Sequence, residues 1–98
     1  YKITSNFPDT EKFGLTSQLR RASVSVCSNI AEGSARKTDK DKARYTTIAF
    51  SSAVEVLNQL IIAKELNFIS EHNYLNCRSQ IESITNKLNA LRKHQINK

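Results

Sequence analysis

An apolar repeat with the period of an α-helix is the feature that most constrains the fold of this 98-residue chain. The repeat consists of Leu15, Leu19, Ala22, Val26 and Ile30. Spacings of 4, 3, 4 and 4 positions confine these residues to one side of a helix, and that side must pack against other helices. We predict a helix that begins near Thr10 or Leu15 and ends at Glu32, with Gly33 as a left-handed stop.

Two further segments carry the end signals of long helices. Thr38 is a suitable N-cap for a helix from about Asp39 to Leu66. Ser70 is a suitable N-cap for a third helix, and Glu71 follows it as a favourable charge in the first turn. With only two glycines and one proline, the chain lacks the turns of an all-β fold or a disulfide scaffold. The sequence therefore predicts one all-α domain over the whole chain.

The second predicted helix is apolar around most of its circumference. One stripe contains Tyr45, Ala49, Val56, Leu60 and Ala63, and another contains Phe50, Val54, Leu57 and Ile61. A helix that is apolar over so wide an arc is buried by several neighbours at once, either inside its own bundle or between subunits. We therefore expect a homo-oligomer and take the second stripe as the candidate oligomer interface.

The third predicted helix has a narrower, coiled-coil-like seam. The seam consists of Tyr74, Cys77, Ile81, Ile84, Leu88 and Leu91. Such spacing favours packing at a small crossing angle against antiparallel neighbours. Cys27 and Cys77 have no disulfide-framework spacing, so we interpret them as small packing residues, with a redox role or a disulfide as the alternative.

The segment FGLTSQLRRA, followed by SNIAEG and then Arg36, resembles the hallmark of a protein family named for intervening sequences in bacterial 23S ribosomal RNA genes. The resemblance extends to Phe7-Pro8, to IAFSSAVEVLNQLIIAKELNFIS and to the last helix, so it covers essentially the whole chain. It implies an up-and-down antiparallel four-helix bundle. The family's first helix would precede Tyr1, and YKITSNFP resembles only its tail, so we expect most of that helix to lie outside this chain.

The resemblance also implies partners. Relatives form ring-like homo-oligomers described as pentamers, and five copies of a chain with net charge +6 would carry about +30. One relative, the accessory variability protein of diversity-generating retroelements, works with a reverse transcriptase. We therefore expect self-association, and also a nucleic-acid-processing protein as a partner. A cytoplasmic location follows from the resemblance together with the unpaired cysteines.

Basic residues gather around the predicted connection between the first two helices. Five basic residues lie in the segment from Arg36 to Arg44, and only Asp39 and Asp41 oppose them, so the local excess is three positive charges. Phosphate neutralisation releases counterions and dominates nonspecific affinity, so this excess favours a polyanionic partner. The candidate nucleic-acid-binding residues are Arg20, Arg21, Arg36, Lys37, Lys40, Lys42 and Arg44. For Arg20 and Arg21, salt bridges to a neighbouring subunit are the alternative.

Other polar residues have structural explanations. A second basic group, Lys87, Arg92, Lys93 and Lys98, is interpreted as favourable charge at a helix C-terminus. Asn29, Glu32 and Gly33 are candidate structural residues, which either hydrogen-bond to a neighbouring helix or hold the turn.

No catalytic residue, cofactor or metal site is predicted. His72 and His94 have no partners at metal-ligand spacing, and no glycine-rich phosphate loop occurs. No uninterrupted apolar run approaches the ~18 residues of a membrane span. The expected function is therefore that of a non-enzymatic homo-oligomeric bundle which binds the backbone of RNA or DNA. The alternative is a structural or protein-interaction scaffold whose charge only maintains solubility.

Overall fold

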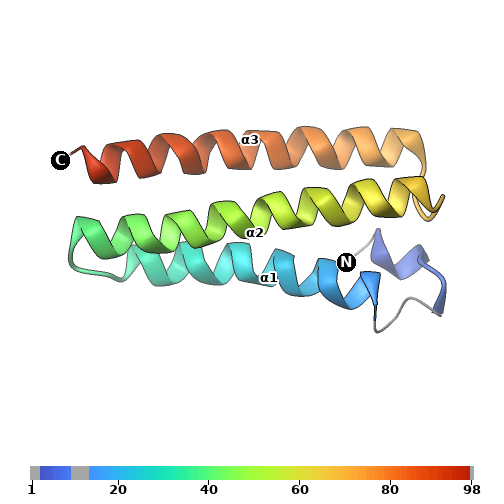
Figure 1. The fold of residues 1–98 in the computed structure, drawn as a ribbon, viewed down its shortest axis with the longest axis horizontal. Coiled ribbons are helices and arrows are strands. Elements are labelled where there is room, and N and C mark those ends of the chain that lie inside the picture. The colour runs from blue at the N-terminus through green and yellow to red at the C-terminus, as the bar shows by residue number, and fades with distance from the viewer. Residues whose placement is uncertain (1–2, 10–13, 98) are drawn as a thin grey trace.

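Three long helices make up the fold. The computed structural model describes residues 3–9 and 14–97, which form a 3₁₀ turn η1 (Thr4–Asn6) and the helices α1 (Leu15–Ser34), α2 (Asp39–Glu65) and α3 (Glu71–Ile96). The helices run antiparallel in succession, and α2 packs against both α1 and α3 (Figure 1). The all-α prediction is confirmed. The described residues hold three helices and no strand, so a fourth bundle helix is not among them.

The predicted helix ends agree closely with the structure. The Thr38 hydroxyl accepts a hydrogen bond from the backbone N–H of Asp41 at 3.2 Å, and the Ser70 hydroxyl accepts one from Asn73 at 3.1 Å. These two side chains satisfy N–H groups that would otherwise lack partners in the first turn. Gly14 is the N-cap of α1, so the start near Leu15 is confirmed. The other predicted start, at Thr10, lies outside the described residues.

The predicted left-handed stop at Gly33 is wrong. Gly33 lies inside the last turn of α1, which continues to Ser34, and no glycine in the described part of the chain has a positive φ. A Cβ atom at Gly33 would lie only 3.1 Å from the Cβ of Tyr45 on α2. Glycine therefore suits this position because α1 and α2 approach closely here, and the handedness of the backbone plays no part.

The core is concentrated on α2 and on the parts of its neighbours nearest to η1. The main buried cluster joins Phe7, Leu15, Leu19, Leu60, Ala63, Tyr74 and Ile81. The predicted apolar repeat of α1 is buried at Leu15, Leu19 and Ala22 but is 43% exposed at Ile30. Burial of this repeat therefore decreases towards the C-terminal end of α1, although Gly33 in the last turn is buried.

Polar side chains cross the helix interfaces at defined heights. Gln59 on α2 donates from Nε2 to Oε1 of Gln18 on α1 at 2.9 Å, and the hydroxyls of Ser25 and Ser52 lie 2.7 Å apart. A buried polar group without a hydrogen-bond partner destabilises the folded state. Such pairs therefore favour the one register of α1 against α2 in which both partners meet. α2 is also long and apolar enough to cross a membrane, by length and composition alone, as the core helices of soluble proteins often are.

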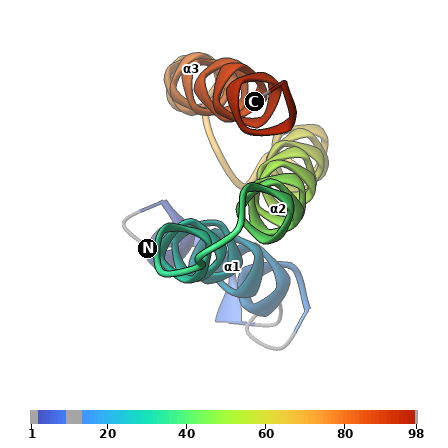
Figure 2. The same cartoon turned by 90° about the vertical axis from the view of Figure 1, so that its left-hand side faces the viewer.

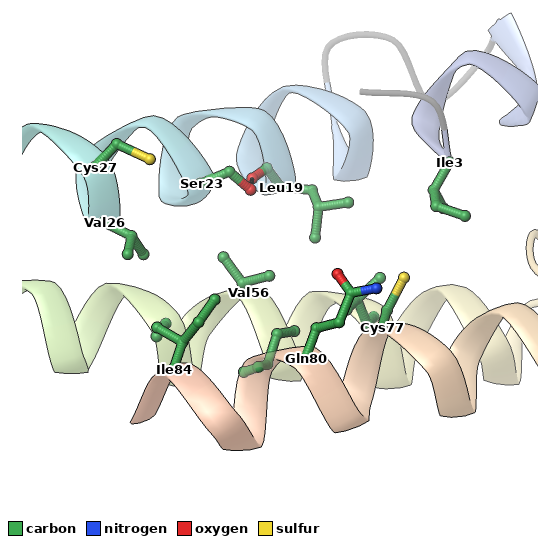
Figure 3. Close-up of a pocket in the computed structure, with 12 residues that line it drawn as sticks. Ile3, Leu19, Ser23, Val26, Cys27, Val56, Cys77, Gln80 and Ile84 are labelled. Carbon is green, nitrogen blue, oxygen red and sulfur yellow. Dashed lines mark hydrogen bonds between the residues drawn. The ribbon is translucent and has the colours of Figure 1, made fainter. Parts of the chain in front are cut away.

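The bundle is open on one side. Viewed end-on, α2 lies between α1 and α3, which do not close over it (Figure 2). A mostly apolar groove of about 330 Å³ runs between α1 and α3 (Figure 3), with α2 contributing Val56 and Leu60. The α3 seam is accordingly only half covered: Ile81 is buried, while Ile84, which lines the groove, is 40% exposed.

Candidate nucleic-acid interface

The structure brings the two basic groups of the sequence to one end of the bundle. The connection after α1 and the C-terminal end of α3 lie together at the left of Figure 1. The Thr46 hydroxyl of α2 donates to Oε1 of Gln95 on α3 at 2.8 Å. Arg92 Nε likewise donates to the hydroxyl of Thr47 at 2.8 Å. The second basic group therefore lies at the C-terminal end of α3, as its interpretation as favourable helix-end charge requires, and also beside the first turns of α2.

This end of the molecule carries most of the net charge. Its seven cationic side chains are Arg36, Lys37, Lys40, Lys42, Arg44, Arg92 and Lys93. We call this set the basic end. The carboxylates of Glu32, Asp39 and Asp41 oppose it, so it has an excess of four positive charges out of +6 for the chain. Lys87 lies further from this end along α3, and Lys98 is outside the described residues.

Three arginines of the basic end are held in place by neighbours. Arg36 forms an ion pair with Glu32 at 2.5 Å, and its guanidinium carbon lies 4.9 Å from the centre of the Tyr45 ring. Arg44 lies 5.8 Å from the same ring centre, also within cation–π range. The hydrogen bond that Arg36 donates to the Glu32 carboxylate raises the pKa of Arg36 above its ordinary value. Arg92 is the third, through Thr47.

The lysines differ in how far they reach into water. Lys37, Lys40 and Lys93 are exposed, whereas Lys42 is half-buried. Exposed ammonium groups on flexible stems can follow a polyanion, while the held arginines offer fixed positions. The basic end therefore combines both kinds of phosphate-binding side chain.

The structure does not bring Arg20 and Arg21 to the basic end. Arg20 is half-buried, and its Nε donates to the hydroxyl of Thr4 in η1 at 2.8 Å. Arg21 is exposed one residue further along α1. At 1.5 Å per residue, the helix separates Arg21 from Ser34 by about 20 Å. Arg20 thus links η1 to α1.

The candidate structural residues near the end of α1 act mainly within that helix. Asn29 donates from Nδ2 to the backbone oxygen of Ser25 at 2.8 Å and to its hydroxyl at 3.1 Å. The contact across to α2 is then made by Ser25 with Ser52. Glu32 pairs with Arg36 and so orients a residue of the basic end.

The candidate oligomer stripe on α2 is divided. Phe50 and Leu57 are half-buried, whereas Val54 is 46% and Ile61 is 40% exposed. Other large apolar side chains of α2 are also exposed, and the stripe did not include them. They are Ile48 and Ile62. A substantial part of the wide apolar arc of α2 is therefore left uncovered within one chain.

The cysteines line the groove between α1 and α3 and are both free (Figure 3). Cys77 is half-buried and packs against the core cluster, as predicted. Cys27 is exposed, so its prediction as a packing residue is wrong in this structure, because no described element covers that side of α1. Within the described ranges, no group of three or more His, Cys, Asp or Glu side chains is placed to hold a metal ion.

Comparison with known proteins agrees with the resemblance carried by the hallmark. The family model described as 23S rRNA-intervening sequence protein matches residues 1–90. No curated protein matches the chain. The match spans most of the 98 residues, including the three helices almost to the end of α3. The chain therefore belongs to the 23S rRNA-intervening sequence protein family.

Proposed function

We propose that this protein is a non-enzymatic, cytoplasmic, homo-oligomeric helical bundle that binds RNA or DNA through the basic end. The observation that supports the proposal is the excess of four positive charges on one end of the fold. Each neutralised phosphate releases condensed counterions, so a concentrated patch of this kind binds polyanions without reading their sequence. A nucleic-acid-processing protein is the partner that such an accessory protein would serve.

Affinity for ribosomal RNA across a salt series tests this function. We expect binding by fluorescence anisotropy, with log K falling against log salt at a slope of about −4 to −6 if most of the seven cations contact phosphates. The reason is that the slope reports the number of phosphates neutralised. No binding at about 50 mM salt would sink the proposal, since electrostatic affinity is strongest there.

The uncovered apolar surfaces support self-association and a fuller bundle. We propose that a fourth helix packs in the groove between α1 and α3, giving the up-and-down four-helix bundle. We further propose that Val54 and Ile61 lie at an interface between copies, because 46% and 40% exposure of large apolar side chains favours burial by a partner. A pentameric ring is the assembly that family resemblance suggests.

Light scattering tests the assembly. A pentamer of this 11.1-kDa chain would have a mass of about 55 kDa. Val54→Asp with Ile61→Asp should lower the mass, because each change places a charge in an apolar interface. Ser79→Asp with Ser83→Asp adds the same charge at exposed polar positions of α3, so it is the matched control and should leave the mass unchanged. A monomeric wild type at micromolar concentration would contradict the assembly.

The same exposed apolar residues favour a second candidate function. A protein-interaction scaffold would use the uncovered face of α2 for a partner, and its positive charge would only maintain solubility. The salt series separates the two functions, since a scaffold predicts no affinity for RNA or DNA at any salt concentration.

A further inference from the structure

We infer that the C-terminal end of α3 and the connection after α1 form one phosphate-binding surface, and that its ligand is double-helical nucleic acid. This inference rests on the proposed function and specifies the class of nucleic acid. Its starting point is the juxtaposition of Arg92 and Lys93 with residues 36–44, which are separated by about fifty positions in the sequence.

The two halves of the surface are joined by side-chain contacts. Arg92 donates to Thr47, and Gln95 accepts from Thr46, so the last turns of α3 are held beside the first turns of α2. The ends of α1, α2 and α3 lie in that order across this end of the molecule, with α2 in the middle (Figure 2). Adjacent packed helices are separated by about 8–10 Å, so cations on all three ends extend over roughly 20 Å. A surface of this width contacts several phosphates within one turn of a nucleic-acid double helix.

The aromatic side chains exclude base stacking as the main mode at this surface. Tyr45 is half-buried, and the guanidinium groups of Arg36 and Arg44 lie against its ring. Among the described residues, no Phe or Tyr side chain is exposed, and the exposed rings are the smaller imidazoles of His72 and His94. Proteins that bind single strands combine a basic groove with aromatic platforms for the bases. A basic surface without an exposed Phe, Tyr or Trp ring fits the regular phosphate array of a duplex, which is recognised by shape and backbone.

Neutralising the α3 half tests the shared surface. The variant Arg92→Gln with Lys93→Gln is titrated with duplex RNA, duplex DNA and single strands, each of about 20 nucleotides. We expect the salt slope on duplex to become shallower by about 2, and affinity at about 0.1 M salt to fall about 50-fold. Arg21→Gln with Arg78→Gln changes the net charge equally and lies outside the basic end, so its slope should match that of the wild type.

The outcomes separate this inference from the proposed function. Tighter wild-type binding to either duplex than to single strands, together with the slope change, supports it. An unchanged slope for the α3 variant would overturn the shared surface, and tighter binding to single strands would overturn the duplex ligand. In both cases binding to residues 36–44 would still stand. No binding of the wild type to any of the three probes would overturn the proposed function as well.

Discussion

Reversing three charges at the basic end is expected to weaken nucleic-acid binding by about 100-fold or more at about 0.1 M salt. The variant combines Arg36→Glu, Lys37→Glu and Lys40→Glu. Each change removes a phosphate contact and adds repulsion, so the salt slope on duplex should fall by about 3. Fluorescence anisotropy measures both quantities. Far-ultraviolet circular dichroism should stay unchanged, because all three side chains are exposed.

A control variant separates the local surface from the net charge. Arg21→Glu, Lys64→Glu and Arg78→Glu together change the charge by the same amount away from the basic end. We expect this control to lose far less affinity, since long-range attraction between exposed charges is screened within about 10 Å. Equal losses in the two variants would show that binding follows total charge and has no defined surface.

Replacing Leu60 by alanine is expected to lower the free energy of unfolding by about 2–5 kcal/mol. Leu60 is only 3% exposed on the middle helix and belongs to the main core cluster, so truncation leaves a cavity among side chains of all three helices. For a domain of this size, whose total stability is about 5–15 kcal/mol, this loss is large. Urea denaturation followed by circular dichroism measures it.

The same chemical change on the surface is the control. Leu75 on α3 is 50% exposed, so Leu75→Ala should change the free energy of unfolding by less than about 1 kcal/mol. A similar loss for both variants would mean that burial in the cluster around Leu60 contributes no more to stability than the exposed surface at Leu75, which would contradict this account of the core.

The helices themselves were predictable because their signals are local. The N-caps Thr38 and Ser70 act within one turn, and both helix starts lie where the sequence predicts them. The prediction of a left-handed stop at Gly33 was wrong because it considered only local signals. A glycine after an apolar repeat is typical of a helix stop, but the restriction here is the close approach of Tyr45, which belongs to another helix. That contact depends on tertiary packing, and no local pattern reports it.

The basic end could be recognised only in part. The group from Arg36 to Arg44 is contiguous, so its charge is visible in the sequence. Arg92 and Lys93 join it because three antiparallel helices in succession return the end of the third to the end of the first. Counting helix directions is the signal that predicts this juxtaposition. Two further features could be recognised only from the side-chain positions. Tyr45 and Thr47 contact arginines of the basic end, and Arg20 contacts η1 instead.

Mapping the contact residue by residue is the most direct test of the basic end as a nucleic-acid interface. Isotope-labelled protein is titrated with duplex RNA, and the chemical shifts of its backbone amides are followed by nuclear magnetic resonance. We predict that the perturbed amides concentrate in residues 35–44 and 92–97. Perturbations concentrated instead around Arg20 and Arg21, with the ends of α1 and α3 unaffected, would contradict the account.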